Sequence, residues 1–122
     1  MNQLTVPPID SISGEVRLPG SKSLSNRALL LAGLARGNTR LTNLLKSEDT
    51  QRMVAALKQF GVHLELNNDW TECTVTGNAG LFNPPTDKRF FMGNAGTAIR
   101  PLTAILALIN GDWEIDGDGY MR

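Results

Sequence analysis

The spacing of apolar residues along the chain predicts three helices. Residues 23–36 are apolar on nearly every side, which is typical of a helix buried in an interior. Residues 48–60 place apolar side chains three and four positions apart, opposite polar ones, and predict an amphipathic helix. A third, apolar helix follows the glycine-rich residues 93–97 and extends to about Ile109. The residues expected to bound or begin these helices are Arg36 and Gly37, Ser47 and Gly61, and Pro101.

Alternation of apolar and polar residues predicts short strands between these helices. The predicted strands are residues 4–6, 13–18, 39–43, 62–66, 71–76, 89–92 and 111–116. Turn-forming residues at 67–69 join two of them into a hairpin, whereas residues 78–87, with Pro84 and Pro85, are typical of a surface loop. The order of elements predicts an α/β or α+β protein in which helices pack against a sheet.

Composition narrows the class of protein. A chain of 122 residues has the size of one domain. Its 12 basic and 12 acidic residues give a formal net charge of zero, which argues against a nucleic-acid or anionic-membrane partner. The one cysteine, Cys73, excludes an internal disulfide and a multi-cysteine metal site. The sequence has neither a long apolar run nor a basic-then-apolar start, so we expect a cytoplasmic chain that is neither exported nor membrane-spanning.

The stretch 18–27 has the composition of an anion site at a helix N-terminus. Ser21 or Ser23 can cap the first helix, and Lys22 and Arg27 lie close by in the sequence. Unpaired N–H groups and the helix dipole favour an anion there, and phosphate is the commonest one of suitable shape. The competing interpretation is an ordinary serine cap with a lysine in its first turn. A nucleotide-binding P-loop is excluded, because the glycines that this motif requires before its lysine are missing.

A second glycine-rich loop, residues 93–97, also begins a helix. Small residues let a ligand approach the backbone N–H groups closely, with Gly96 offering an unobstructed amide. The Asn94 side chain can donate a further hydrogen bond. The alternative for this loop alone is that its glycines only make a tight turn.

Together, the two loops resemble the two N-terminal signatures of the EPSP synthase (3-phosphoshikimate 1-carboxyvinyltransferase) family. The matching stretches are Leu18-Pro-Gly-Ser-Lys-Ser-Leu-Ser-Asn-Arg27 and Gly93-Asn-Ala-Gly-Thr-Ala-Ile-Arg-Pro101, with Thr42-Asn-Leu-Leu45 and Gly119-Tyr-Met-Arg122 in support. The sister family, UDP-N-acetylglucosamine enolpyruvyl transferase, carries Lys-Asn where this chain has Lys22-Ser23, and it lacks the Ser-Asn-Arg that follows. The resemblance therefore favours the shikimate family.

The resemblance implies repeated βαβαββ units, arranged as an inside-out β/α barrel in two domains, and incomplete in this chain. Residues 1–19 would be strands that pack with the second domain. Residues 20–122 would be one unit of the first domain and the start of the next. The remainder of the family chain is absent, and the glycine-rich ending at 117–122 fits a sequence cut in mid-loop.

The implied reaction transfers the enolpyruvyl group of phosphoenolpyruvate to the 5-hydroxyl of shikimate 3-phosphate, without metal or organic cofactor. By resemblance Lys22 contacts both substrates, Ser23 and Arg27 hold shikimate 3-phosphate, and Asn94 and Gly96 hold phosphoenolpyruvate. Further candidates are Ser21, Thr97 and Arg100. No residue of this portion is assigned to catalysis itself, and Arg122 is given no ligand role.

Two other interpretations stay open: a relative of the sugar-nucleotide transferase, and a small non-catalytic phosphate-binding module. For the leading one, we expect a monomer at full length, a fragment that self-associates, and no turnover by this chain alone. Four residues are interpreted as structural, two of them as favourable acids at the start of the second helix. They are His63, Cys73, Glu48 and Asp49.

Overall fold

Three helices and five strands make up the protein in a computed structural model that describes residues 2–82 and 85–122. They are α1 (Lys22–Leu34), β1 (Arg36–Thr42), α2 (Glu48–Gln59), β2 (His63–Leu66), β3 (Glu72–Asn78), β4 (Arg89–Phe91), α3 (Gly96–Leu106) and β5 (Glu114–Asp116). The mixed α/β class predicted from the sequence is confirmed. Of the predicted loop 78–87, Asn83 and Pro84 lie outside the described residues, and Asn78 belongs to β3.

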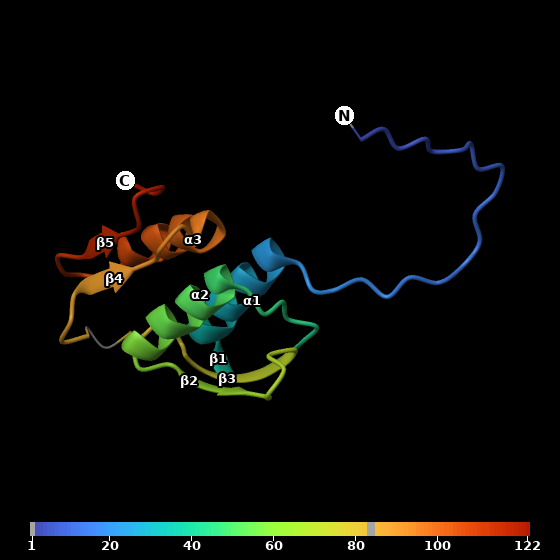
Figure 1. Cartoon of the computed structure of the whole chain (residues 1–122). Helices are drawn as coiled ribbons and strands as arrows, with labels where there is room; N and C mark the ends of the chain where they lie inside the picture. The colour runs from blue at the N-terminus through green and yellow to red at the C-terminus, as the bar shows by residue number, and fades with distance from the viewer. Residues whose placement is uncertain (1, 83–84) are drawn as a thin grey trace.

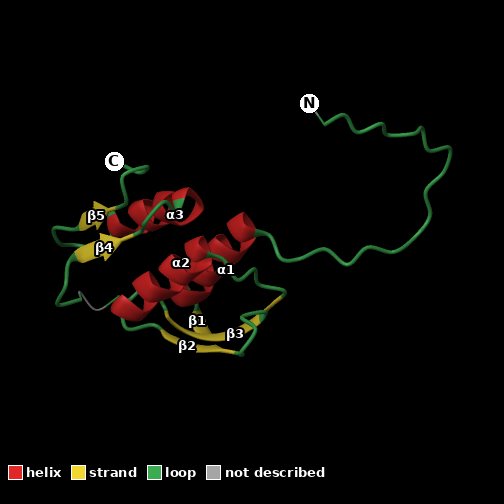
Figure 2. Ribbon diagram, in the orientation of Figure 1, coloured by secondary structure: helices red, strands yellow, loops and turns green. Residues whose placement is uncertain are grey.

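The elements form layers around the pair α1 and α2 (Figure 1). Strands β1, β3 and β2 form an antiparallel sheet in that order, and the helix pair covers one of its faces. Helix α3 contacts both helices on the side away from this sheet, together with the parallel pair β4 and β5 (Figure 2). The predicted hairpin is confirmed by the pairing of β2 with β3.

Helix α2 has the amphipathic character that its sequence predicts. Met53, Val54 and Leu57 are buried in the core. Ser47 caps the helix: the Thr50 N–H donates to Ser47 Oγ at 3.3 Å, and the Ser47 N–H donates to Thr50 Oγ1 at 2.9 Å. Phe60, at the other end, lies with its ring centroid 4.9 Å from that of Phe90 on β4. The aromatic pair therefore ties α2 to the second sheet.

Helix α1 differs from its prediction as a wholly internal helix. Leu29 and Leu30 are buried, but Leu24 and Leu31 are 64% and 66% exposed. These two leucines lie seven positions apart, and so on the same side of the helix, and both are open to solvent. The helix also ends at Leu34, so Arg36 begins β1 rather than closing the helix.

The two predicted N-terminal strands, 4–6 and 13–18, are wrong for this structure. Residues 2–21 contain no strand, and the segment 2–19 is exposed and extends away from the folded body (Figure 1). A strand exists only by hydrogen bonding to a neighbour, and no described element lies alongside this segment. The segment joins the body at Gly20, where an added Cβ would lie 2.1 Å from the Asn43 carbonyl oxygen. That it packs with a second domain stays a prediction.

Helix α3 begins at Gly96 and ends at Leu106, three residues before the predicted end at Ile109. Pro101 lies inside the helix. None of the helices in the described chain is long and apolar enough to cross a membrane.

Candidate anion-binding site

A cavity of about 380 Å³ opens where the N-terminal ends of the three helices meet. The residues that line it are Lys22, Ser23, Arg27, Asp49, Asn94, Gly96, Thr97, Arg100 and Pro101. Seven of the eight ligand candidates nominated from the sequence are among them, from segments about 70 residues apart in the chain. The fold therefore brings the two predicted loops to one place.

Helix α1 supplies the lysine, serine and arginine of the cavity from its first two turns. Ser21, the eighth candidate, is its N-cap: the Leu24 N–H donates to Ser21 Oγ at 3.3 Å. Ser21 lines a neighbouring hollow instead of the cavity. Lys22 is the first residue of the helix and is half exposed, while Arg27 is exposed. Both cations are therefore accessible to a ligand from solvent.

The opposite wall comes from the loop that begins α3. Gly93 has φ of +57°, a conformation that disfavours other residues, and it turns the chain into the helix. No side chain of the described residues caps α3 at Ala95. An added Cβ on Gly96 would meet no described atom within 4 Å. The first turn of α3 thus presents the positive end of the helix dipole to the cavity. Its amides are partly engaged: the Gly96 N–H, predicted from the sequence to be offered to a ligand, donates to the Asn94 carbonyl oxygen at 3.0 Å.

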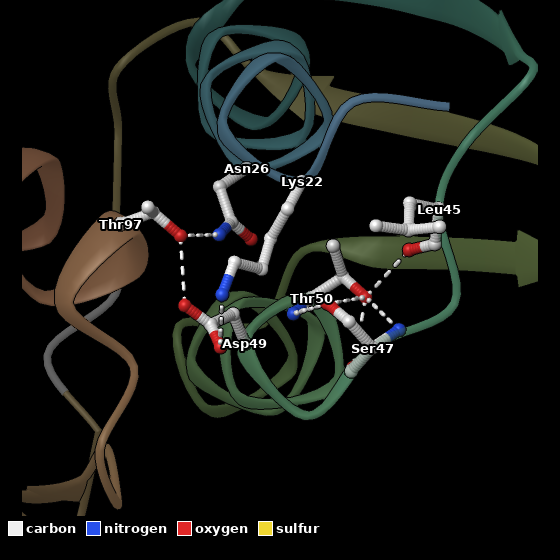
Figure 3. A network of polar contacts seen from close by, with 7 residues as sticks. All are labelled: Lys22, Asn26, Leu45, Ser47, Asp49, Thr50 and Thr97. Atoms are coloured by element: carbon white, nitrogen blue, oxygen red, sulfur yellow. Dashed lines mark hydrogen bonds and ion pairs between the residues drawn. The ribbon is translucent and has the colours of Figure 1, made fainter. Parts of the chain in front are cut away.

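Asp49 is a cavity residue that the sequence analysis interpreted only as a helix-start acid. Its side chain is 12% exposed. Thr97 Oγ1 donates to Asp49 Oδ2 at 2.8 Å, and Lys22 Nζ donates to Asp49 Oδ1 at 3.4 Å (Figure 3). Its neighbour Glu48 instead pairs with Arg52 at 3.1 Å, outside the cavity. No spacing rule in the sequence pairs Asp49 with Lys22, which lies 27 positions away.

Asn26 completes a chain of hydrogen bonds through three helices. Its Nδ2 donates to Thr97 Oγ1 at 2.9 Å, so the chain runs from α1 through Thr97 on α3 to Asp49 on α2 (Figure 3). Asn26 is fully buried and does not line the cavity. The three helix starts are therefore held together by side chains at the base of the cavity.

The cavity is electropositive although the whole chain has no net charge. Of the described residues that line it, three are cations and one is a carboxylate, a formal local charge of +2. The N-terminal dipole ends of α1, α2 and α3 add to this charge. The arrangement suits an anion that carries more than one negative charge, such as a phosphate ester.

The other titratable residues lie away from the cavity. Arg122 donates to Asp116 at 2.7 Å, and hydrogen bonds from Arg122, Arg89 and the Gly117 N–H lower the pKa of Asp116 below its usual range. Burial raises the pKa of Cys73, which lies on β3. Within the described residues, no group of three His, Cys, Asp or Glu side chains is placed to hold a metal ion.

Comparison with known proteins gives a consistent family match. The family model described as EPSP synthase (3-phosphoshikimate 1-carboxyvinyltransferase) matches residues 6–122. The chain is 56% identical to the 3-phosphoshikimate 1-carboxyvinyltransferase of Sulfurovum sp. (strain NBC37-1) and 53% identical to that of Shewanella piezotolerans. Each match covers all of this chain and 29% of the relative, so the chain spans less than a third of their length.

Solved structures give the same match. The EPSP synthase from Acinetobacter baumannii aligns with a TM-score of 0.79 at 31% sequence identity, over 87% of this chain and 24% of that one. The fold predicted from the resemblance is confirmed at this level. Within the described residues, the first strand of the expected βαβαββ unit is missing, and α1 to β3 supply the rest.

Proposed function

The chain belongs to the EPSP synthase family, and from that premise we propose that it is part of an enzyme of the shikimate pathway, which leads to chorismate and the aromatic amino acids. The reaction is transfer of the enolpyruvyl group of phosphoenolpyruvate to the 5-hydroxyl of shikimate 3-phosphate. Its products are 5-enolpyruvylshikimate 3-phosphate and phosphate.

The observation that carries the proposal is the single cavity into which both loops project. Both substrates are phosphorylated anions, and bringing them together requires cations and helix-end amides that offset their mutual repulsion. We assign shikimate 3-phosphate to the α1 wall, where Ser23 and Arg27 lie. Phosphoenolpyruvate is assigned to the α3 wall, where Asn94 and Gly96 lie. Lys22, which also belongs to the α1 wall, is assigned to both substrates.

The chemical step joins O5 of shikimate 3-phosphate to C2 of phosphoenolpyruvate, while the O5 hydroxyl loses its proton and C3 gains one. The tetrahedral intermediate then loses phosphate from C2 and a proton from C3. Asp49 is the one carboxylate among the described residues of the cavity, and both its oxygens already accept hydrogen bonds from protein groups. We therefore assign the proton transfers to none of the described residues, and we propose that the chain alone does not turn over.

We place the enzyme in the cytoplasm and propose a monomeric full-length protein. Six large apolar residues between positions 4 and 18 are exposed, which supports self-association of this chain or packing of the segment on a second domain. Size-exclusion chromatography at increasing concentration tests the first alternative: a constant monomeric elution volume would contradict it.

Amide NMR titration tests the substrate assignment. Shikimate 3-phosphate is expected to shift resonances of residues 21–27, and phosphoenolpyruvate those of 93–97. Both sets of shifts should be lost in Lys22→Ala and retained in Lys58→Ala, which removes an exposed lysine of α2 that does not line the cavity. Shifts that persist in Lys22→Ala, or that scatter over the chain, would contradict the assignment. Stronger binding of UDP-N-acetylglucosamine would instead support the sister activity.

A further inference from the structure

Asn26 is a fully buried polar side chain whose amide oxygen has no hydrogen-bond partner among the described residues. Its Nδ2 donates to Thr97 Oγ1, but its Oδ1 is buried and has no partner among the described residues. Leaving a buried amide oxygen unpaired costs free energy, and native structures contain few such groups. An apolar residue here would avoid that cost. The presence of an amide is therefore explained by the hydrogen bond that its Nδ2 group donates.

The orientation of this amide follows from the hydrogen-bond chain itself. An ionised carboxylate only accepts hydrogen bonds, so the single hydroxyl proton of Thr97 is committed to Asp49 Oδ2 at 2.8 Å. The Thr97 oxygen can then only accept, and Asn26 must present its NH₂ group to it. Turning the amide over would place two acceptors together. The Asp49 carboxylate therefore fixes the direction of both hydrogen bonds, and Asn26 is the donor at the end of the chain.

The same contacts fix the spacing of the two cavity walls. Asn26 precedes Arg27 on α1, and Thr97 follows Gly96 on α3. The bond between their side chains joins the two walls at the base of the cavity: Thr97 lines the cavity, whereas Asn26 is fully buried and does not. Through Thr97, it also holds the Asp49 carboxylate in place as the acceptor for Lys22.

From this geometry we propose that Asn26 is a positioning residue: acting through Thr97, it sets the distance between the α1 and α3 walls and the placement of Lys22. The proposal rests on the proposed function for the identity of the two phosphorylated ligands. The hydrogen-bond chain itself can be tested without either ligand.

The first test is ligand-free NMR of the 122-residue chain. Asn26→Ala is expected to shift the Lys22 ammonium and Gly96 amide resonances, and Thr97→Val to shift the Asn26 side-chain amide pair. Leu64→Ala, which removes a buried contact of β2, is the matched control for lost stability and should leave all three unshifted. Unshifted Lys22 and Gly96 resonances in Asn26→Ala would overturn the proposal.

The second test is binding of phosphoenolpyruvate to the same variants. Asn26→Ala and Thr97→Val are each expected to weaken affinity about tenfold, because a displaced wall misplaces its ligand groups. The double variant should lose no more than either single variant, since both break one chain of bonds. Thr97→Ser restores the hydroxyl and should recover most of the affinity lost in Thr97→Val. Additive losses, or unchanged affinity in Asn26→Ala, would overturn the proposal.

The two tests separate the two proposals. If the unmodified chain binds neither phosphoenolpyruvate nor shikimate 3-phosphate, the substrate assignment of this chain fails. The ligand-free resonances then decide on Asn26 alone: shifts at Lys22 and Gly96 support its positioning role, and their absence refutes it.

Discussion

Replacing Asp49 by asparagine should strengthen anion binding while weakening the fold. The change keeps the shape of the side chain and removes its charge. Thr97 loses a charged acceptor at 2.8 Å, which costs about 1–2 kcal/mol of unfolding free energy. The pair with Lys22 is half exposed and contributes less than about 1 kcal/mol.

The gain in binding follows from the distances at Lys22. Nζ lies 3.4 Å from Asp49 Oδ1, so a phosphate oxygen that accepts from Nζ at about 2.8 Å lies within roughly 6 Å of the carboxylate. Two unit charges that far apart repel by about 0.7 kcal/mol in water and about 3 kcal/mol at an effective dielectric of 20. Because the cavity is open to solvent, a value toward the lower end, about 1 kcal/mol, applies. Removing about 1 kcal/mol of repulsion tightens binding about fivefold.

The assay is phosphoenolpyruvate titration of both proteins at low and at high salt, with thermal unfolding of each. Glu48→Gln is the matched control, because this neighbouring carboxylate pairs with Arg52 and does not line the cavity. We expect the fivefold gain for Asp49→Asn at low salt, a smaller gain at high salt, and no gain for the control. Weaker binding by Asp49→Asn would refute the reasoning. It would mean that Asp49 helps binding more, by positioning the Lys22 ammonium, than it hinders binding by repelling the ligand.

Three further predictions concern space and pH. Gly96→Ala should leave thermal stability unchanged and weaken phosphoenolpyruvate binding in the titration, because the added methyl meets no described atom and projects from the open turn of α3. Gly77→Ala should lower the unfolding free energy, measured in urea, by about 1–3 kcal/mol, because its Cβ would lie 2.2 Å from the Ala35 carbonyl oxygen. Gly119→Ala is the control: an added Cβ there meets no described atom within 4 Å, so its unfolding free energy should match that of the unmodified chain. Arg122 and Arg89 lower the pKa of Asp116 in the folded protein. The contribution of Asp116 to folding stability is therefore complete above the unfolded-state pKa of about 3.9 and is lost as pH falls below it. Asp116→Asn should therefore reduce the melting temperature near pH 7 and have a smaller effect at about pH 2, and an equal loss at both would contradict this.

Local rules account for the parts of the fold that sequence reasoning predicted. The cap at Ser47, the apolar face of α2 and the hairpin of β2 and β3 each depend on residues a few positions apart. The predicted strands 4–6 and 13–18 failed for the opposite reason. Alternation describes a face that would fit against another element, and it does not say whether that element is present. The exposed leucines of α1 show the same limit, since an apolar helix predicts burial only where something covers it.

The candidate site was predictable where its ligand-binding residues lie close together in the sequence. Lys22 and Arg27, or Asn94 and Gly96, stand near one helix start, and their composition is visible in a short window. Asp49 and Asn26 were missed because their roles depend on contacts across 48 and 71 positions to Thr97. An acid at a helix start and an asparagine inside a helix both have ordinary local explanations. Only the packing of the three helices shows that these two residues belong to the hydrogen-bond chain of the site.

Asp49 also explains how an electropositive cavity can exist without a ligand. Three cations and three helix N-termini in one place repel one another, and the carboxylate offsets part of that repulsion by accepting from Lys22 and Thr97. An incoming phosphate must then compete with Asp49 for Lys22, whereas no described side chain competes for the uncapped first turn of α3. The two walls therefore differ in kind: the α1 wall binds by exchanging charged partners, whereas the α3 wall offers the positive end of the helix dipole and the Asn94 side chain. Binding at the α1 wall, which carries two of the three cations among the described cavity residues, should accordingly depend more steeply on ionic strength, because charge pairs near solvent are screened more than hydrogen bonds to neutral groups.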